Sequence, residues 1–276
     1  GAEIISIKGK KDQLNYMWRR DASQWANSAP ILFPIVGALK NDTCVINGKE
    51  YHMTQHGFAR HNEFETNQVS DTEVIFSLKS NDEIIKQYPF LFELNVTYRL
   101  VENKLKCHIE VKNTDHQPIY FQVGGHPAFA CPFMQNESSN DYYLEFSENE
   151  TCNRKIIDVE KRGMSRVEKP FFDNEKRFFV RQELFNTDAI VIKNFKSENI
   201  SLKSLNHDKS IVFHMNGFDH VGLWAAKHVG GLIAIEPWVG HADYTDFNGE
   251  FKEKESCVEL PVGKNFEVEF AVEINQ

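Results

Sequence analysis

Hydrophobic and polar residues alternate with a period of two along most of the chain. Over residues 267–274, Val, Phe or Ile alternates with Glu or Ala. Residues 94–100 and 105–111 repeat the pattern on either side of a polar turn at Glu102 and Asn103. Such alternation is typical of strands with one buried and one solvated face, and two such runs around a short turn predict an antiparallel hairpin.

Further short strands are expected along the whole chain. Residues 44–46 and 50–52 flank Asn47-Gly48, a pair that suits the two positive φ angles of a type I′ hairpin turn. The remaining predicted strands are 72–78, 141–146, 189–192, 210–214, 220–225 and 231–235.

Helical signal is scarce. The best candidate is 82–86, which Asn81 can cap and which must end before Pro89. The polar stretch 148–166 predicts a loop.

Many strands joined by short turns favour two packed antiparallel sheets. We therefore expect an all-β fold, a large antiparallel β-sandwich, formed by residues 1–276 as a single domain.

Composition narrows the class of protein. The 276 residues carry a formal net charge of −9 without a basic stripe, which argues against nucleic acid and anionic membranes as partners. The five cysteines form no C-x-x-C pair, as expected of reduced thiols. No apolar run approaches the roughly 20 residues of a membrane span, and no secretory leader opens the chain. We expect a cytoplasmic protein.

Two segments carry an ionisable side chain at a position where a strand or turn usually has none. His126 lies between Gly125 and Pro127 after an apolar strand, well placed to carry a proton; a satisfied histidine in a tight bend is the alternative. Glu236 ends an apolar run before Pro237-Trp238, where burial would raise its pKa towards that of a working base. A glutamate paired with a lysine at a strand edge is the alternative.

A third segment, 55–60, combines His56, Gly57 and Arg60 and could bring polar side chains to a ligand or simply form a solvated turn. His52 and His56 have an H-x-x-x-H spacing, but on a strand these positions lie about 13 Å apart. No metal site is therefore expected there. The serines lack nucleophile-elbow glycines, and the glycines form no phosphate-binding loop.

Five stretches in this order resemble the aldose 1-epimerase (galactose mutarotase) superfamily, most closely its LacX-like branch. They extend over nearly the whole chain. These stretches are 28–37 (SAPILFPIVG), 51–60 (YHMTQHGFAR), 124–129 (GGHPAF), 184–197 (LFNTDAIVIKNFKS) and 217–243 (GFDHVGLWAAKHVGGLIAIEPWVGHAD).

The resemblance implies a galactose mutarotase-like supersandwich with a sugar pocket. By match to the motifs, His126 falls on the general acid and Glu236 on the general base. His56 and Arg60 fall on substrate-orienting positions, and Asp188 matches an aspartate that binds sugar hydroxyls.

Asp219 is a rival for the role of Asp188. Trp224 or Trp238 could supply an apolar face for the sugar or belong to the core.

The chain departs from the family pattern in two places. Ala38 stands where members often carry a basic residue, and Lys40 follows two positions later. LacX-like proteins usually have another strand or two before the point where this chain opens, which suggests a truncated N-terminus.

The resemblance implies an enzyme without cofactor that interconverts the α and β anomers of a free aldose by acid–base ring opening. A hexose-6-phosphate mutarotase and a non-catalytic carbohydrate-binding protein are the alternatives. The expected partner is a small sugar, and we expect a monomer or weak homodimer.

Overall fold

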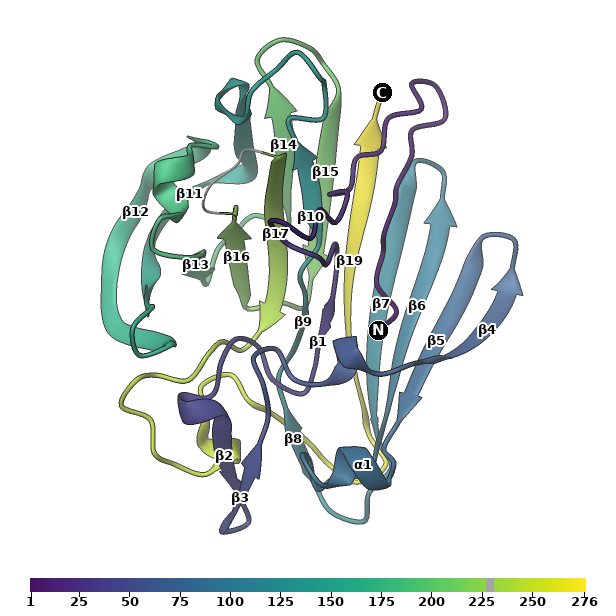
Figure 1. Ribbon diagram of the computed structural model, residues 1–276, viewed down its shortest axis with the longest axis vertical. Helices are drawn as coiled ribbons and strands as arrows, with labels where there is room; N and C mark the ends of the chain where they lie inside the picture. Colours follow the sequence, from purple (N-terminus) through teal and green to yellow (C-terminus); the bar gives the residue numbers. More distant parts are fainter. Residues whose placement is uncertain (227–230) are drawn as a thin grey trace.

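The computed structural model describes residues 1–226 and 231–276, and strands dominate this part of the chain (Figure 1). Residues 227–230, inside the fifth motif, lie outside it. No helix among the described residues is long and apolar enough to cross a membrane. The all-β prediction is confirmed.

Fifteen strands of the described residues form one antiparallel sheet. Its main path runs β1 (Ile31–Leu32), β9 (Val123–Gly125), β17 (Gly231–Val239), β16 (His220–Trp224), β13 (Ile190–Lys193), β11 (Tyr142–Asp158), β14 (Asn199–Ser204), β15 (Ser210–Asn216), β19 (Asn265–Asn275), β7 (Lys104–Asn113), β6 (Phe92–Val101), β5 (Glu73–Lys79) and β4 (Glu65–Ser70). Beside this path, β10 (Ala128–Cys131) pairs with β17, and β12 (Gly163–Phe179) pairs with β11.

Smaller elements complete the described chain. Two further pairs are β2 (Thr43–Ile46) with β3 (Lys49–His52) and β8 (Ile119–Phe121) with β18 (Val258–Leu260). The helical elements are α1 (Asp82–Ile85) and the 3₁₀ turns η1 (Lys40–Asp42), η2 (Ala59–His61), η3 (Ser139–Asp141), η4 (Gln182–Phe185) and η5 (Phe251–Glu253).

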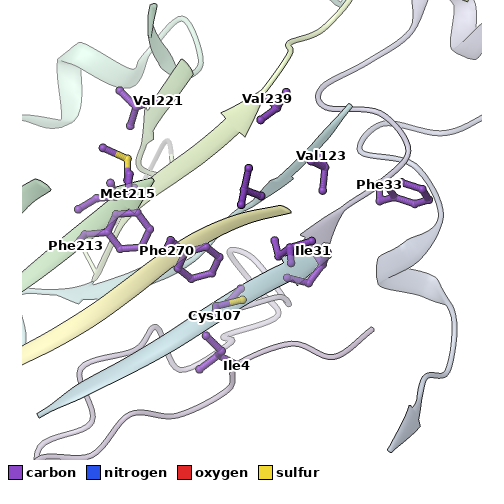
Figure 2. Close-up of a cluster of buried hydrophobic side chains, with 14 of the residues drawn as sticks. Ile4, Ile31, Phe33, Cys107, Val123, Phe213, Met215, Val221, Val239 and Phe270 are labelled. Atoms are coloured by element: carbon purple, nitrogen blue, oxygen red, sulfur yellow. The ribbon is translucent and has the colours of Figure 1, made fainter. Parts of the chain in front are cut away.

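The sheet folds over so that its β1–β9 end packs against the middle of the same sheet (Figure 2). The rings of Phe213 on β15 and Phe270 on β19 stack with centroids 5.4 Å apart. Phe129 on β10 contacts Phe213 at 6.0 Å, and a Cβ added to Gly125 on β9 would lie 2.9 Å from the Phe270 ring. A sandwich therefore forms within one continuous sheet, whereas the sequence suggested two separate sheets.

The local sequence signals explain these elements. β6 and β7 form the predicted hairpin around Glu102 and Asn103, and β19 extends the sheet beyond β7. Asn47 and Gly48 have the positive φ angles expected of their turn. The Asn81 side chain accepts hydrogen bonds from the backbone N–H groups of the first turn of α1.

The predicted loop at 148–166 is wrong. This segment belongs to the long hairpin of β11 and β12, whose register shifts at four places. Each β-bulge moves the following side chains to the other face, and most of β12 is exposed, so the period of two is lost. The hairpin turn places Arg162 next to Asp42 in η1, with which it forms an ion pair.

Candidate active site

One cavity of about 360 Å³ collects the residues singled out from the sequence. It lies where the β9–β10 turn, β17, the β3–η2 segment and the β11–β12 hairpin meet. The predicted residues that line it are His56, Arg60, His126, Asp188 and Glu236. The structure thus brings five residues together that lie up to 180 positions apart, while their individual roles stay predictions.

His126 and Glu236 form the buried floor of the cavity. The Nε2 atom of His126 lies 3.2 Å from Oε2 of Glu236, and both side chains are almost fully buried. β9 can approach β17 this closely because Gly124 has no side chain: a Cβ there would lie 2.7 Å from the Pro237 carbonyl oxygen. The Nδ1 atom of His126 and Oε2 of Glu236 have no hydrogen-bond partner among the described residues.

Burial disfavours charge on both members of the pair. It raises the pKa of the Glu236 carboxyl well above its usual value, and the Asp188 carboxylate acts in the same direction. Burial also lowers the pKa of His126 to about 3, and the positive charge of Arg60 adds to the effect. Burial therefore favours the uncharged form of the pair, with its single titratable proton on Glu236.

His56 is fixed in one tautomer. Its Nδ1 accepts a hydrogen bond from the Gly37 N–H at 3.1 Å, so Nε2 carries the ring proton. Its backbone N–H in turn donates to the Gly37 carbonyl at 2.9 Å. Burial, with His126 and Arg60 nearby, lowers the pKa of His56 well below its usual range. The ring is therefore a neutral hydrogen-bond donor, and it meets the His126 ring edge-on at 5.6 Å.

Arg60 brings a cation to the cavity from η2. One guanidinium nitrogen, Nη2, donates to the Gln55 carbonyl at 3.0 Å, while Nε is buried without a hydrogen-bond partner among the described residues. Burial lowers the pKa of Arg60, which nevertheless stays charged because its usual value is so high. Because Arg60 lines the cavity, its guanidinium places a positive charge beside the space that a ligand would occupy.

The two rival aspartates occupy different places. Asp188 lies between η4 and β13 with a φ of 84°, and it accepts a hydrogen bond from the Ala189 N–H at 2.7 Å. It lines the cavity. Asp219 is not among the cavity-lining residues, and its carboxylate accepts hydrogen bonds from Ser256 and the Gly240 N–H.

Aromatic rings surround the imidazole of His126. Trp25 stacks on it with ring centroids 4.7 Å apart and an interplanar angle of 30°. Trp224 meets the same imidazole edge-on at 5.6 Å and Trp25 at 5.5 Å. Both predicted tryptophans, Trp224 and Trp238, line the cavity. Trp25 was missed, although a tryptophan in the polar stretch 21–28 without periodic apolar neighbours was a usable signal.

Ala38, where members of the family often carry a basic residue, lines the cavity, and a second arginine, Arg162, lines it as well. Lys40 does not take the place of the basic residue, because its Nζ donates to Asn248 at 2.7 Å and to the Phe247 carbonyl. Arg162, in the turn between β11 and β12, lines the cavity and forms a bidentate ion pair with Asp42 at 3.0 and 3.1 Å. Sequence reasoning could not find Arg162, because the hairpin that carries it was taken for a loop.

His52 is not among the residues that line the cavity, so His52 and His56 do not meet there. Within residues 1–226 and 231–276, the cluster with suitable metal-ligand spacing is His220, His241 and Glu255, which lies outside the cavity.

Comparison with known proteins shows which family this chain resembles. A family model described as aldose 1-epimerase matches residues 1–259. The plasmid-encoded protein LacX of Lactococcus lactis is 35% identical over 254 residues, which cover 87% of this chain and 82% of that protein. The chromosomal LacX of the same organism matches equally well.

Solved structures show the same fold. A galactose mutarotase related enzyme from Lactobacillus acidophilus superposes with a TM-score of 0.95 at 31% identity, covering 100% of this chain and 92% of that one. A galactose mutarotase-like protein from Lactobacillus casei gives 0.92 at 31% identity, covering 100% and 94%. Fold and cavity together define a galactose mutarotase-like β-sandwich. The chain belongs to the aldose 1-epimerase family.

Proposed function

We propose that this protein is a mutarotase that interconverts the α and β anomers of a free aldose by opening and reclosing the sugar ring. The observation that carries the proposal is the buried His126–Glu236 pair, with Nε2 and Oε2 only 3.2 Å apart on the cavity floor. Ring opening needs a base for the C1 hydroxyl proton and an acid for the ring oxygen.

The proton balance of the pair fits this reaction. Glu236 takes the C1 hydroxyl proton while His126 gives a proton to the ring oxygen; the aldehyde rotates about C1–C2 and the roles reverse on closure. The starting form, ionised Glu236 with protonated His126, carries the same single titratable proton as the uncharged pair that burial favours. A sugar that hydrogen-bonds to both residues in the cavity would favour the ionic form, and no proton from solvent is needed for that change.

The other cavity residues supply orientation and charge stabilisation. Neutral His56 can donate Nε2–H to a sugar oxygen, and the guanidinium of Arg60, which lines the cavity, can stabilise charge developing on an oxygen in the transition state. Asp188 can accept from sugar hydroxyls. Trp25 and Trp224 offer apolar surfaces against which the C–H face of a sugar can pack.

Polarimetry tests the proposal. Freshly dissolved α-D-glucose and α-D-galactose should reach their equilibrium rotation faster with the protein than without it. His126→Asn should slow the catalysed rate about 10²–10⁴-fold, the usual contribution of one proton-transfer group. His108→Asn is a matched control, because His108 faces Glu267 at 3.7 Å in an exposed pair. Saturable sugar binding without acceleration would contradict catalysis and support a carbohydrate-binding protein.

A hexose-6-phosphate mutarotase is the second candidate, favoured by the two arginines that line the cavity, Arg60 and Arg162. Arginine is well suited to phosphate because its guanidinium donates two parallel hydrogen bonds. A phosphorylated substrate would have to compete with Asp42 for Arg162. If it does, glucose 6-phosphate should be turned over faster than glucose, and Arg162→Gln should remove that preference while leaving the rate on free glucose unchanged.

A further inference from the structure

Two buried histidines, His220 and His241, lie on or next to the strand pair β16–β17, which also carries Glu236. On β16, Gly222 is the register partner of Glu236, and His220 is the partner of Trp238. His241 follows shortly after β17, and its ring meets that of His220 with centroids 5.1 Å apart. Both side chains are almost fully buried, at 0% and 2% exposure. Neither residue lines the cavity, so the proposed reaction gives them no role.

The hydrogen bonds of both rings leave a lone pair on Nε2. Nδ1 of His241 lies 2.6 Å from the Ala242 carbonyl, which can only accept, so Nδ1 carries the proton. Nδ1 of His220 lies 2.8 Å from a carboxylate oxygen of Asp219, which already accepts from Gly240, so this nitrogen donates as well. Each Nε2 is therefore an acceptor, and neither accepts a hydrogen bond from any of the described residues.

Two buried lone pairs without a donor are unfavourable, because each has lost its hydrogen bond to water and gained none in the protein. A histidine whose Nδ1–H is held by a carboxylate or a backbone carbonyl is also the usual form of a metal-ligating histidine. With the proton on Nδ1, each histidine therefore has an unprotonated Nε2 that can bind a cation.

A carboxylate completes the cluster. Oε2 of Glu255 lies 3.6 Å from Nε2 of His241 and accepts a hydrogen bond from the Tyr244 hydroxyl at 2.6 Å. One donor atom from each of His220, His241 and Glu255 lies within 4.8 Å of the other two. In a tetrahedral zinc site with bonds of about 2.0–2.1 Å, ligand atoms are about 3.3 Å apart, so small side-chain rotations would close this set around an ion.

We propose that His220, His241 and Glu255 form a binding site for one divalent transition-metal ion of the zinc type. Two imidazoles and one carboxylate favour zinc over magnesium or calcium, which prefer oxygen ligands. Three protein ligands leave a fourth position for water. The proposal does not depend on the mutarotase reaction.

The charges around the site are compatible with a cation. Lys193 pairs with Glu255, but through Oε1, on the other oxygen of the carboxylate. Lys155 lies 3.9 Å from the same Oε1 and is also held by Glu168 at 3.4 Å and by the Tyr244 hydroxyl at 2.9 Å. Both lysines therefore leave Oε2 to the two histidines.

An ion here would join three segments that the backbone ladder does not connect directly: β16, the chain after β17, and the chain after η5. Ala242, next to His241, lines the cavity, and the Asp243 N–H donates to the Ala38 carbonyl at 2.9 Å. The ion would thus stabilise one wall of the cavity from behind, without contacting a sugar.

Calorimetric titration of zinc chloride into tag-free protein, stripped of metal by dialysis against a chelator, tests the proposal. We expect one zinc ion per chain and a zinc-dependent rise in melting temperature. His241→Gln should weaken binding at least about tenfold, the lower end of the effect of disturbing a metal site. His214→Gln is the matched control, because His214 lies outside the cluster and forms a partly buried pair with Glu273 at 2.8 Å.

Two outcomes would overturn the proposal. The first is no zinc binding by the wild-type protein, which would mean that the three side chains do not form a metal site. The second is binding that survives in His241→Gln but is lost in His126→Asn, which would place the ion in the sugar cavity. Near-UV circular dichroism shows whether each variant is folded, and Glu255→Gln, which keeps the shape of the carboxylate, replaces His241→Gln if that variant unfolds.

Discussion

Trp25 stacks on the imidazole of His126, with ring centroids 4.7 Å apart, and so covers the side of the proposed general acid that would otherwise be more open to solvent. Trp25 comes from the irregular segment before β1, whereas His126 lies in the β9–β10 turn. The contact links an otherwise polar N-terminal segment to the chemistry of the cavity.

Replacing Trp25 with alanine should raise the pKa of His126. Burial holds this pKa at about 3, and removal of the indole admits water, which favours the charged form. A raised pKa means that the pair takes up its second, inactivating proton at higher pH. The acid limb of kcat/KM should move upward by about 0.5–1 pH unit. An unchanged limb in a folded Trp25→Ala protein would show that the indole does not control solvent access to His126.

Asp188→Asn should move the alkaline limb in the opposite direction. The Asp188 carboxylate helps to raise the pKa of Glu236, so removing its charge lowers that pKa. The pair then loses its single proton at lower pH, and kcat/KM should fall earlier on the alkaline side. Asparagine is the suitable replacement because it tolerates the positive φ of 84°. An alkaline limb that stays in place would argue against electrostatic coupling between the two residues.

Gly222→Ala should displace Trp238. A Cβ at Gly222 would lie 2.7 Å from the six-membered ring of the indole, which lines the cavity. Overpacking of this kind costs about 1–3 kcal/mol in the free energy of unfolding, and the sugar should also bind less tightly. Urea denaturation and polarimetry measure the two effects.

The double variant Gly222→Ala/Trp238→Phe provides the check on that prediction. Phenylalanine lacks the atoms that clash, so the alanine should be less destabilising in this background than in the wild-type protein. Equal destabilisation in both backgrounds would mean that the cost comes from the β16 backbone.

Glu145→Gln should destabilise the protein at neutral pH and much less in acid. Glu145, on β11, forms ion pairs with Arg177 on β12 at 2.5 Å and with Lys203 on β14. Burial raises the pKa of the Glu145 carboxyl, but the two cations outweigh burial and lower this pKa below its usual 4.5. A carboxyl with a lowered folded-state pKa stabilises above its unfolded-state pKa, and this contribution is lost as the pH falls below about 4.5.

Urea unfolding should therefore show a loss of about 1–2 kcal/mol for Glu145→Gln at pH 7 that shrinks towards pH 3. Glu267→Gln, in an exposed pair, is the control and should change little at either pH. A loss that is constant with pH would assign the effect to packing.

The sequence alone determined the fold class and many of the elements. Alternation at 94–100, 105–111 and 267–274 identified β6, β7 and β19 because a half-buried strand shows its two faces directly in its sequence. Asn81 and Asn47-Gly48 located α1 and the β2–β3 turn because their signals are local. The motifs also selected the five residues that line one cavity, and the family model agrees with the resemblance on which that selection rested.

Tertiary structure alone decided the rest. The 148–166 segment carries no clean period, because bulges shift its register and solvent covers most of β12, so the hairpin that brings Arg162 to the cavity was hidden. Trp25 on His126, and the facing rings of His220 and His241, join residues far apart in the chain. Contacts of this kind depend on how the sheet folds over, and the pKa values of the site depend on the burial that results. Neither the contacts nor the burial can be predicted from a short stretch of sequence.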